Sequence, residues 1–480
     1  MTDSRSAKRS DIGMVGLGVM GRNFVLNMAD NGFAVAGYDV DADKVSALRE
    51  AAQGRAIEAV GSLPDFLALL DVPRAVMMLV PAGKVVDQVI KDLLPQLTPG
   101  DVIIDAGNSY FEDTDLRARA LAEKGIQYLG VGISGGEEGA RHGPSIMPGG
   151  PRAAYDRVRP MLEAAAAKVD DRPCVAYLGP GSAGHFVKMV HNGIEYGAMQ
   201  LIAESYDLMK RGLGLSDDDM HDVYGAFNDG ELNGYLVQIT SDIFSRADDE
   251  TGKRLIDEIL DAAKQKGTGM WTSQIAMTLQ APVPTIDVAV AMRNLSAAQS
   301  QRDSAGRAFK REVRSYEGDR DGLLAQLRGA LHAGMVITYA QGMALLKAAS
   351  EAYAYHLDLQ EVARIWRGGC IIRAALLQDI RTAYRNEPEL TNPLFDEAIA
   401  AKVQAHDGDL RRIVCVAAEL GVPMPGLMTA LAYLDAFASD WLPANLIQAQ
   451  RDYFGAHSYE RVDMKGSFHT HWEIEESQGS

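Results

Sequence analysis

The sequence predicts an α/β protein with an N-terminal Rossmann-like, doubly wound parallel sheet, a large all-α domain and a C-terminal tail. Three observations lead to this expectation. Short apolar runs alternate with helical patterns over residues 1–180, helical patterns alone fill 181–440, and residues 441–480 are poorly periodic and rich in aromatic, His, Gly and Ser residues. Strands that alternate with helices are typical of βαβ units in a parallel sheet. We therefore expect domains at 1–180 and 181–440 and a tail at 441–480.

Five short apolar runs in the first part predict strands, at residues 11–16, 33–39, 74–80, 101–107 and 126–133. The stretches between them have helical spacing, and several end with Gly or Asn, as helices commonly do. After Gly181 the chain becomes a series of long patterns rich in Ala, Leu and Met, separated by turn residues such as Gly212 and Pro282. These longer patterns predict helices without an intervening sheet.

The composition indicates a globular protein and argues against several classes. The 480 residues are 47% apolar and 23% charged, which is ordinary, and the net charge of −18 is unsuited to a broad nucleic-acid surface. The three cysteines, Cys174, Cys370 and Cys415, are too few for a disulfide framework and lack the spacing of a metal site. The N-terminus is polar, and no uncharged apolar run reaches membrane-spanning length. We expect a cytoplasmic protein.

The first predicted strand leads into a glycine-rich turn of the dinucleotide-binding type. Gly16, Gly18 and Gly21 fit G-x-G-x-x-G, a helical pattern follows, and a second strand closes with Asp39, 18 residues after Gly21. The glycines permit a tight turn and a close approach to a pyrophosphate, and the acid can accept from ribose hydroxyls. The whole order predicts a dinucleotide site rather than a plain tight turn, with the small residues of VPAGK and DAGNS at the same sheet edge.

The residues after the second strand bear on the choice between NAD and NADP. Asp39, Val40 and Asp41 place two acids where a 2′-phosphate would need cations. Two unit charges about 4 Å apart cost about 4 kcal/mol at an effective dielectric of 20. Lys44 offsets part of this repulsion. The sequence therefore favours NAD, with NADP possible, unless Asp41 turns to solvent and Asp39 only caps a turn.

Two further segments carry polar residues in apolar surroundings. Lys188, His191, Asn192 and Glu195 are spaced i, i+3, i+4 and i+7, which places them on one helix face. This face is either a buried salt-bridge network or a catalytic surface. In residues 133–150, Ser134-Gly135-Gly136 can aim several donors at one anion or can form an ordinary loop. Residues 147–150, Met-Pro-Gly-Gly, predict a type II turn.

At this point the chain resembles the 6-phosphogluconate dehydrogenase family, in its long decarboxylating form. The resemblance rests on segments that run in family order from residue 11 to 472, namely GLGVMGRN, IDAGNS, GISGGEEGARHGPSIMPGG, GPGSAGHFVKMVHNGIEYGAMQL, QKGTGMWT, WRGGCIIRAA, LIQAQRDYFGAHSYER and FHTHW. It implies oxidation and decarboxylation of 6-phosphogluconate to ribulose 5-phosphate without a metal. Lys188 matches the general base and Glu195 the general acid, which fits a reaction that needs both.

The resemblance also implies the binding residues and the working assembly. The substrate-binding residues that it implies are Asn108, Ser134, Gly135, Gly136, His191, Asn192, Tyr196, Lys266, Thr268, Arg293, Arg451 and His457. The cofactor-binding residues are Gly16, Leu17, Gly18, Val19, Met20, Gly21, Asp39, Val40, Asp41, Val80, Pro81, Ala82 and Asn108. Residues 181–440 would bind substrate and dimerise, and the tail would complete the site of the neighbouring subunit in a homodimer.

The chain departs from the family pattern near the cofactor. NADP-using members carry Asn-Arg-Thr in place of Asp39-Val40-Asp41 and commonly a lysine in place of Pro81, and their glycine-rich ends differ from the acidic EIEESQGS here. Met270 replaces a common lysine beside the KGTG segment. These changes bear on the cofactor and leave the catalytic residues intact.

Two other functions are compatible with parts of the pattern. A related β-hydroxyacid dehydrogenase that acts on a small acid would share the N-terminal domain and the helical lysine, but it would not need a phosphate clamp. A non-catalytic dinucleotide sensor would tolerate a damaged helix face, whereas Lys188 and Glu195 are both present here.

Overall fold

The structure is a computed structural model that describes residues 9–472. Contacts within the chain divide it into two compact units, one extending to Ala430 and the other starting at Leu431. Each unit is described by itself.

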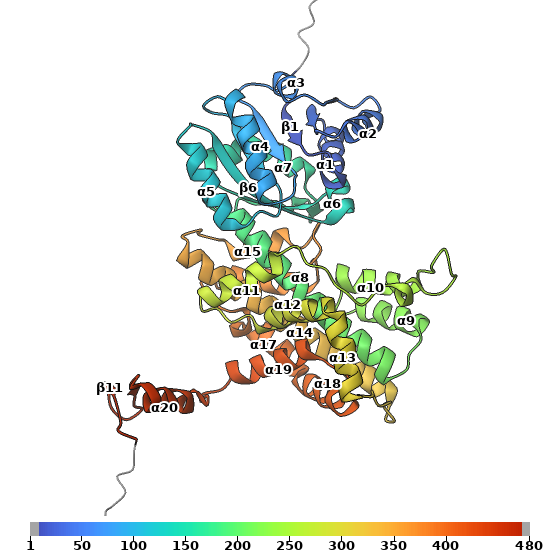
Figure 1. Ribbon diagram of the computed structural model, residues 1–480, viewed down its shortest axis with the longest axis vertical. Coiled ribbons are helices and arrows are strands. Elements are labelled where there is room, and N and C mark those ends of the chain that lie inside the picture. The colour runs from blue at the N-terminus through green and yellow to red at the C-terminus, as the bar shows by residue number, and fades with distance from the viewer. Residues whose placement is uncertain (1–8, 473–480) are drawn as a thin grey trace, which may run out of the picture. The chain divides into compact units, whose positions relative to one another are not determined.

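A seven-stranded sheet forms the first part of the larger unit, in the order β3-β2-β1-β4-β5-β6-β7 (Figure 1). The strands are β1 (Ile12–Val15), β2 (Val35–Tyr38), β3 (Ile57–Val60), β4 (Ala75–Met78), β5 (Val102–Asp105), β6 (Gln127–Ser134) and β7 (Ser145–Gly149). Neighbours pair in parallel except β6 and β7. The strand order reverses between β1 and β4, where ligands bind at the carboxyl ends of such sheets. The expected doubly wound, mostly parallel sheet is confirmed.

Helices cover both faces of the sheet because the buried side chains of each strand alternate between two cores. Met14 of β1 belongs to one core together with Phe24, whereas its neighbour Val15 belongs to the other together with Phe66. The helices of this part are α1 (Val19–Asp30), α2 (Ala42–Ala52), α3 (Leu63–Ala68), α4 (Lys84–Leu93), α5 (Phe111–Ala122), α6 (Gly136–His142) and α7 (Arg152–Ala165). Burial on both faces is what makes the central strands continuously apolar.

Two strands differ from the sequence-based expectation. The type II turn expected at residues 147–150 is wrong, because Met147 to Gly149 belong to β7 and pair antiparallel with β6. β7 lies at the end of the sheet, where a proline such as Pro148 is tolerated because it interrupts only one side of the hydrogen-bond ladder. β3, at the opposite end, was missed because its residues are only partly buried and do not form an apolar run.

After a short antiparallel hairpin of β8 (Lys168–Val169) and β9 (Arg172–Pro173), the rest of the larger unit is helical, as expected. Its helices are α8 (Ala183–Asp207), α9 (Asp217–Asn228), α10 (Tyr235–Ser245), α11 (Thr268–Thr278), α12 (Pro284–Ala297), α13 (Gln299–Phe309), α14 (Arg320–Ala352), α15 (Leu359–Ile365), α16 (Leu376–Asn386), α17 (Glu397–Ala405), α18 (Asp407–Leu420) and α19 (Pro425–Phe437), whose last residues belong to the second unit. None of the helices in residues 9–472 combines the length and the apolar character needed to cross a bilayer.

Helix α8 joins the sheet to the helical core. At its start, Gly184 lies so close to the carbonyl oxygens of Gly130 and Met147 that a side chain would not fit. Further along, Ile194 packs against Gly342 of α14, which also has no room for a Cβ. Figure 1 shows α8 passing from the sheet toward α14. The residues between these two contacts are therefore held by both parts of the unit.

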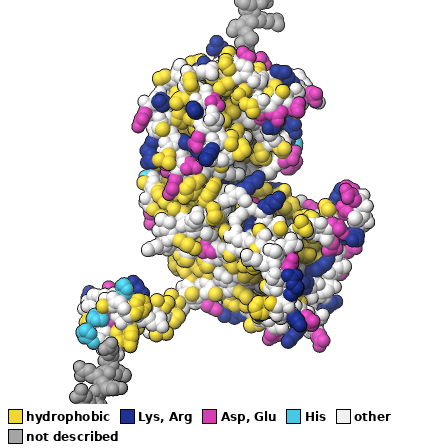
Figure 2. All heavy atoms as spheres, viewed as in Figure 1, with side chains coloured by type: hydrophobic (Ala, Val, Ile, Leu, Met, Phe, Trp, Pro, Cys, Tyr) yellow, Lys and Arg dark blue, Asp and Glu magenta, His cyan; other side chains and the backbone are white. Residues whose placement is uncertain are grey.

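The second unit is more regular than the sequence suggested. It contains α20 (Ala444–Gly455) and a hairpin of β10 (Tyr459–Glu460) and β11 (Ser467–Phe468). Asp452 is fully buried and accepts hydrogen bonds from the backbone of Ser458 and Thr470 and from the Trp472 indole. α20 was missed because its apolar side chains do not form a face that packs on its own unit, and many of them are exposed (Figure 2).

Candidate active site

The glycine-rich turn between β1 and α1 has the geometry that a dinucleotide requires. Gly16 has a φ of 96°, which side-chain-bearing residues rarely adopt, and a Cβ on Gly21 would fall on the Gly16 carbonyl oxygen. Gly18 has no described atom within 4 Å of a built Cβ, so the start of α1 is open to a ligand. The free N–H groups and positive dipole end of α1 therefore face open space, as a pyrophosphate site needs.

Asp39 lies at the carboxyl end of β2 and fixes the turn. Its Oδ2 accepts from the Leu17 N–H at 2.8 Å and its Oδ1 accepts from the Asp41 N–H at 3.0 Å. Asp39 therefore caps the turn, as the alternative interpretation expected. Each of its carboxylate oxygens still has a lone pair that can accept from a ribose hydroxyl. Asp41 caps α2 through the Asp43 N–H, while Lys44 lies 3.7 Å from Asp39 and 3.5 Å from Asp41.

A cleft of about 1140 Å³, open solvent included, begins at this turn. Of the expected cofactor residues, Gly16, Gly18, Asp39, Val40, Val80 and Pro81 line it. The sequence reasoning missed one wall, which Val85, Gln88, Val89 and Asp92 of α4 supply. Their spacing of i, i+3, i+4 and i+7 was visible in the sequence, but nothing there marked this face as lining a site.

The polar stripe of α8 is largely buried and lies against the carboxyl end of β6. Lys188 is 6% exposed and donates to the Asn192 amide oxygen, to which His191 Nδ1 also donates at 3.0 Å. Asn192 donates in turn to the hydroxyl of Thr268 at 3.1 Å, at the first residue of α11. Three of the four stripe residues, Lys188, His191 and Asn192, are thus joined by hydrogen bonds instead of closed ion pairs, and Glu195 lies 4.0 Å from His191.

The end of β6 contacts this face. Because Nδ1 of His191 donates to Asn192, its Nε2 is the acceptor, and the Ser134 hydroxyl donates to it at 3.1 Å. The Ile371 N–H donates to the same Ser134 oxygen at 3.4 Å. Next along the chain, Gly135 has a φ of 133° and lies against the Gly369 carbonyl. The strand end and the 369–371 segment therefore set the position of His191.

Burial shifts the pKa values of the basic and acidic groups of the stripe in opposite directions. Burial lowers the pKa of Lys188, against the raising influence of Glu195, so the neutral amine is favoured more than usual. Burial also raises the pKa of Glu195, although Lys188 and Arg293 oppose it. The pKa of His191 lies well below its usual value because of burial and the Lys188 charge. The 4.0 Å contact between neutral His191 and Glu195 is therefore not an ion pair.

A cation lies beside the C-terminal end of the stripe, next to Glu195. The guanidinium of Arg293 stacks on the Tyr196 ring at 3.4 Å from its centre, and Tyr196 packs on Ala289 and Val290 of α12. Lys266 is exposed and lies two residues before the first turn of α11. Arg293 therefore places a cation beside Tyr196 and near Glu195, whereas Lys266 lies in the loop that leads to Thr268 of α11.

The comparisons with known proteins agree along the whole chain. A family described as the NAD binding domain of 6-phosphogluconate dehydrogenase matches residues 11–179. Another, described as the C-terminal domain of 6-phosphogluconate dehydrogenase, matches residues 184–472, which is more than half of the chain. The chain belongs to the 6-phosphogluconate dehydrogenase family. It is an NAD(P)-dependent oxidoreductase of the decarboxylating type.

Individual relatives in this family are similar over nearly their full length. The NADP(+)-dependent, decarboxylating 6-phosphogluconate dehydrogenase of Bacillus subtilis is 50% identical over 97% of this chain and 99% of its own. The decarboxylating enzyme of Synechococcus elongatus is 49% identical over 96% and 98%. The solved structure of Plasmodium falciparum 6-phosphogluconate dehydrogenase has a TM-score of 0.93 and 41% identity, covering 96% of this chain and all of that one.

The expected site residues of this 6-phosphogluconate dehydrogenase family member fall into three groups. Ser134, Lys188, His191, Asn192 and Thr268 are joined by hydrogen bonds, and Glu195, Tyr196 and Arg293 lie beside them. Gly136 begins α6, whereas Asn108 and Lys266 lie in loops, and none of the three forms a hydrogen bond to the stripe among the described residues. Arg451 and His457 lie in the second unit, and the acidic end at 473–480 lies outside the described residues.

Residues 366–371 were not expected to reach the stripe. The Trp366 ring lies edge-on to His191, with centroids 5.6 Å apart, and Ile371 donates to Ser134. Cys370 is fully buried beside them, and burial raises its pKa to about 12, so it remains a thiol. The WRGGCIIRAA segment was noted for its resemblance to the family, but nothing in its spacing indicated contact with α8.

Proposed function

We propose that this chain oxidises and decarboxylates 6-phosphogluconate to ribulose 5-phosphate and CO2, with Lys188 as general base and Glu195 as general acid. The proposal rests on one observation. Burial lowers the pKa of Lys188 and raises the pKa of Glu195, and both residues lie on the same buried helix face. A base must be neutral and an acid must be protonated at the start of its step, and burial favours both forms here. Two helical turns, about 10 Å of rise, separate the residues.

The residues act in sequence on one sugar acid. Lys188 takes the proton of the C3 hydroxyl, and a bound nicotinamide supplies the acceptor for the hydride from C3. The resulting ketone lies β to the carboxylate, so the electrons of the breaking C–C bond move into it and CO2 leaves. Glu195 then protonates C1 of the enediol. Because the ketone accepts these electrons, the chemistry needs no metal.

Substrate binding is assigned to the polar groups around the stripe. Ser134, Gly135 and Gly136 form the glycine-rich end of β6, which suits a carboxylate or hydroxyl oxygen. The other proposed contacts to the sugar acid come from four residues, His191, Asn192, Tyr196 and Asn108. Lys266, Thr268 and Arg293 would hold the phosphate, because cations and a helix start favour an anion.

We also propose that NAD is preferred over NADP. Asp39 lines the cleft, Asp41 follows two residues later, and the charge of Lys44 is divided between them. Asp92 lines the same cleft and adds a third carboxylate. Val40 is 86% exposed and offers no donor to a phosphate. A carboxylate about 4 Å from a phosphate charge costs about 4 kcal/mol at an effective dielectric of 20. The remaining cofactor residues, Leu17, Val19, Met20, Gly21, Ala82 and Asn108, surround the same strand ends.

We propose a homodimer because the second unit exposes apolar side chains. Helix α20 exposes large apolar side chains, which is unusual for a unit without a partner. Four of them are 59–73% exposed, namely Leu446, Ile447, Tyr453 and Phe454. These side chains would pack on a partner subunit, where Arg451 and His457 would reach the partner's substrate phosphate. Residues 1–180, 181–440 and 441–480 would then serve as cofactor domain, substrate and dimerisation domain, and partner-packing tail.

The first test compares wild type with Lys188→Met, using Lys347→Met as the control. Lys347 lies on α14 and pairs with Glu351 and Glu389 rather than with a residue of the stripe. We expect Lys188→Met to lower kcat for 6-phosphogluconate oxidation by at least 10³-fold while cofactor binding persists, because the base is lost. Near-normal turnover in this variant would overturn the base assignment. The kcat/KM of wild type with NAD and with NADP, followed by CO2 release, tests the cofactor preference in the same assay.

The shared site is tested by mixing two inactive variants. Lys188→Met and Arg451→Ala subunits, refolded together, would form dimers in which one site keeps both Lys188 and Arg451. We expect activity to return on mixing, to about a quarter of wild type if subunits pair at random. No recovery from a mixture that has formed mixed dimers would contradict the contribution of Arg451 across the interface.

A further inference from the structure

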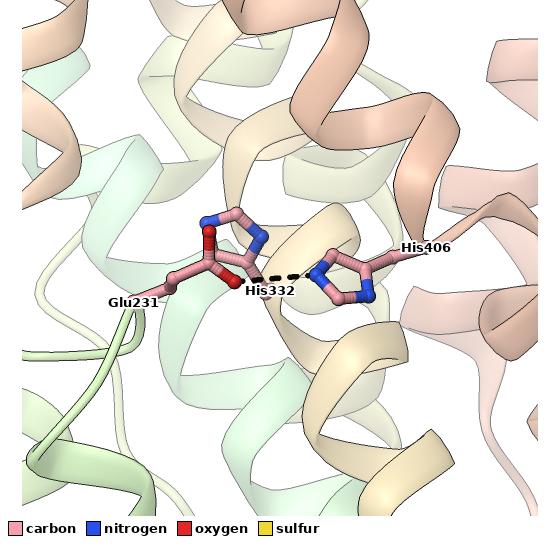
Figure 3. Close-up of side chains that lie close together, drawn as sticks. All are labelled: Glu231, His332 and His406. Atoms are coloured by element: carbon pink, nitrogen blue, oxygen red, sulfur yellow. Dashed lines mark hydrogen bonds and ion pairs between the residues drawn. The ribbon is translucent and has the colours of Figure 1, made fainter.

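Three side chains far apart in the sequence meet outside the proposed active site. Glu231 lies between α9 and α10, His332 lies on α14, and His406 lies between α17 and α18. One ligand-type atom of each lies within 4.8 Å of the others. Figure 3 shows the Glu231 carboxylate beside the His332 ring, with a dashed line to His406. These residues are separated by 101 and 74 positions, so their spacing in the sequence did not indicate a metal cluster.

His406 lies between two carboxylates, those of Asp409 and Glu231. Nδ1 of His406 donates to Asp409 Oδ2 at 3.0 Å, which leaves Nε2 as the nitrogen that can bind a cation. That Nε2 faces Glu231 Oε2 at 3.3 Å. Either a proton on Nε2 or a cation held between the two atoms accounts for this separation. In a tetrahedral site with bonds of about 2.1 Å, ligand atoms lie about 3.4 Å apart, close to the observed separation.

His332 distinguishes a metal ion from a proton. His332 is 3% exposed, and its Nδ1 is buried without a hydrogen-bond partner among the described residues. A proton shared by Glu231 and His406 would leave this nitrogen unsatisfied, whereas a metal ion can bind all three side chains. An unpaired buried polar atom costs about 1–3 kcal/mol.

The surroundings favour a dication. Asp409 orients His406 as a carboxylate orients many metal-bound histidines. Gly329, one helical turn before His332, has no Cβ, and one built there would clash with Asp409 and His406. The nearby cation Lys402 pairs with Asp379 at 2.7 Å. The Glu231 side chain is 55% exposed, which leaves a path from solvent.

We propose that Glu231, His332 and His406 bind one Zn²⁺-type divalent ion, with water as the fourth ligand. Two imidazoles and one carboxylate suit Zn²⁺ and are poor ligands for Mg²⁺, which prefers oxygen. The ion would join three chain segments, so its role is to stabilise the helical core. It takes no part in the oxidation and decarboxylation steps proposed above.

The test measures Zn²⁺ binding to full-length protein first treated with chelator. Titration calorimetry should give one ion per chain, and the Tm should rise with added Zn²⁺ but not with Mg²⁺. Glu231→Gln, which is on the surface, and His406→Gln should each weaken Zn²⁺ binding by more than 100-fold. Asp409→Asn should weaken it by about 10–100-fold, since it only positions a ligand. His356→Gln, an exposed histidine beyond α14, should bind like wild type.

Three results would overturn the site. Wild type that binds no Zn²⁺ would mean that a proton fills the gap between Glu231 and His406. Undiminished binding in Glu231→Gln and His406→Gln would place the ion elsewhere, for example on the histidines of the second unit, His457, His469 and His471. Equal binding of Mg²⁺ would contradict the nitrogen ligands.

Discussion

Replacing Gly132 by alanine tests how the sheet positions the proposed base. Gly132 lies in β6, opposite Met147, and its φ is not in the left-handed region, so alanine meets no backbone strain. The obstacle is steric, because an added Cβ would lie 2.9 Å from Lys188 Cγ and closer still to Lys188 Cβ. Carbon atoms prefer 3.5–4.0 Å, so α8 or the lysine must move by about 1 Å.

A movement of this size has two measurable consequences. Overpacking a buried contact typically costs about 1–3 kcal/mol of unfolding free energy. A misplacement of about 1 Å between reacting groups can cost about 10²-fold in rate. We therefore expect Gly132→Ala to lower kcat for 6-phosphogluconate by about 10²-fold, with a smaller change in the Kd of the cofactor.

The assay pairs steady-state kinetics with denaturant unfolding and uses Gly306→Ala as the matched control. Gly306 lies in α13 with no described atom within 4 Å of a built Cβ, so alanine there should stabilise slightly and leave kcat unchanged. If Gly132→Ala retained kcat within threefold and the stability of wild type, the reasoning that this contact sets the position of Lys188 would be refuted.

Two further predictions concern the cofactor and the pH dependence of stability. Val40→Arg combined with Asp41→Thr should shift the NADP/NAD ratio of kcat/KM upward by at least tenfold, because it exchanges a carboxylate for a cation; an unchanged ratio would show that these positions do not contact the adenosine ribose. Burial raises the pKa of Glu204 to about 7, against hydrogen bonds from Gln200 and the Gly426 and Leu427 N–H groups. Because the folded protein binds this proton more tightly than the unfolded chain does, stability should fall as pH rises from about 4.5 through 7, by at most about 3 kcal/mol. Urea unfolding at pH 5 and 8 should show a smaller decline in Glu204→Gln, and an equal decline would assign the effect to other groups.

The sequence predicted those parts of the site that depend on local spacing. The turn from Gly16 to Gly21 and the stripe from Lys188 to Glu195 follow from distances of a few residues, which fix strand, turn and helix geometry. The residues that surround the stripe depend on packing between distant segments. Ser134 and Trp366 reach His191 across gaps of 57 and 175 positions, and Ile371 reaches Ser134 across 237 positions. Only the resemblance to a family drew attention to the segment that contains Trp366 and Ile371.

The same distinction explains the errors in the fold. β7 contains Pro148 and Gly149, which in isolation favour a turn, but pairing with β6 at the sheet end overrides that preference. α20 has apolar side chains without a buried face in its own unit, so its pattern could not be recognised as a core-facing helix. In both cases the decisive contacts lie outside the segment itself.

The continuity of α8 limits how this enzyme can move. The helix extends unbroken from Ala183 to Asp207, so the groups proposed as base and acid belong to one rigid rod. If the sheet and the helical core shift during turnover, the separation of Lys188 and Glu195 along the axis stays constant. Such a motion would instead change the alignment of both groups with a nicotinamide held at the sheet edge. Closure could therefore control hydride transfer while leaving the later proton transfer to C1 unaffected.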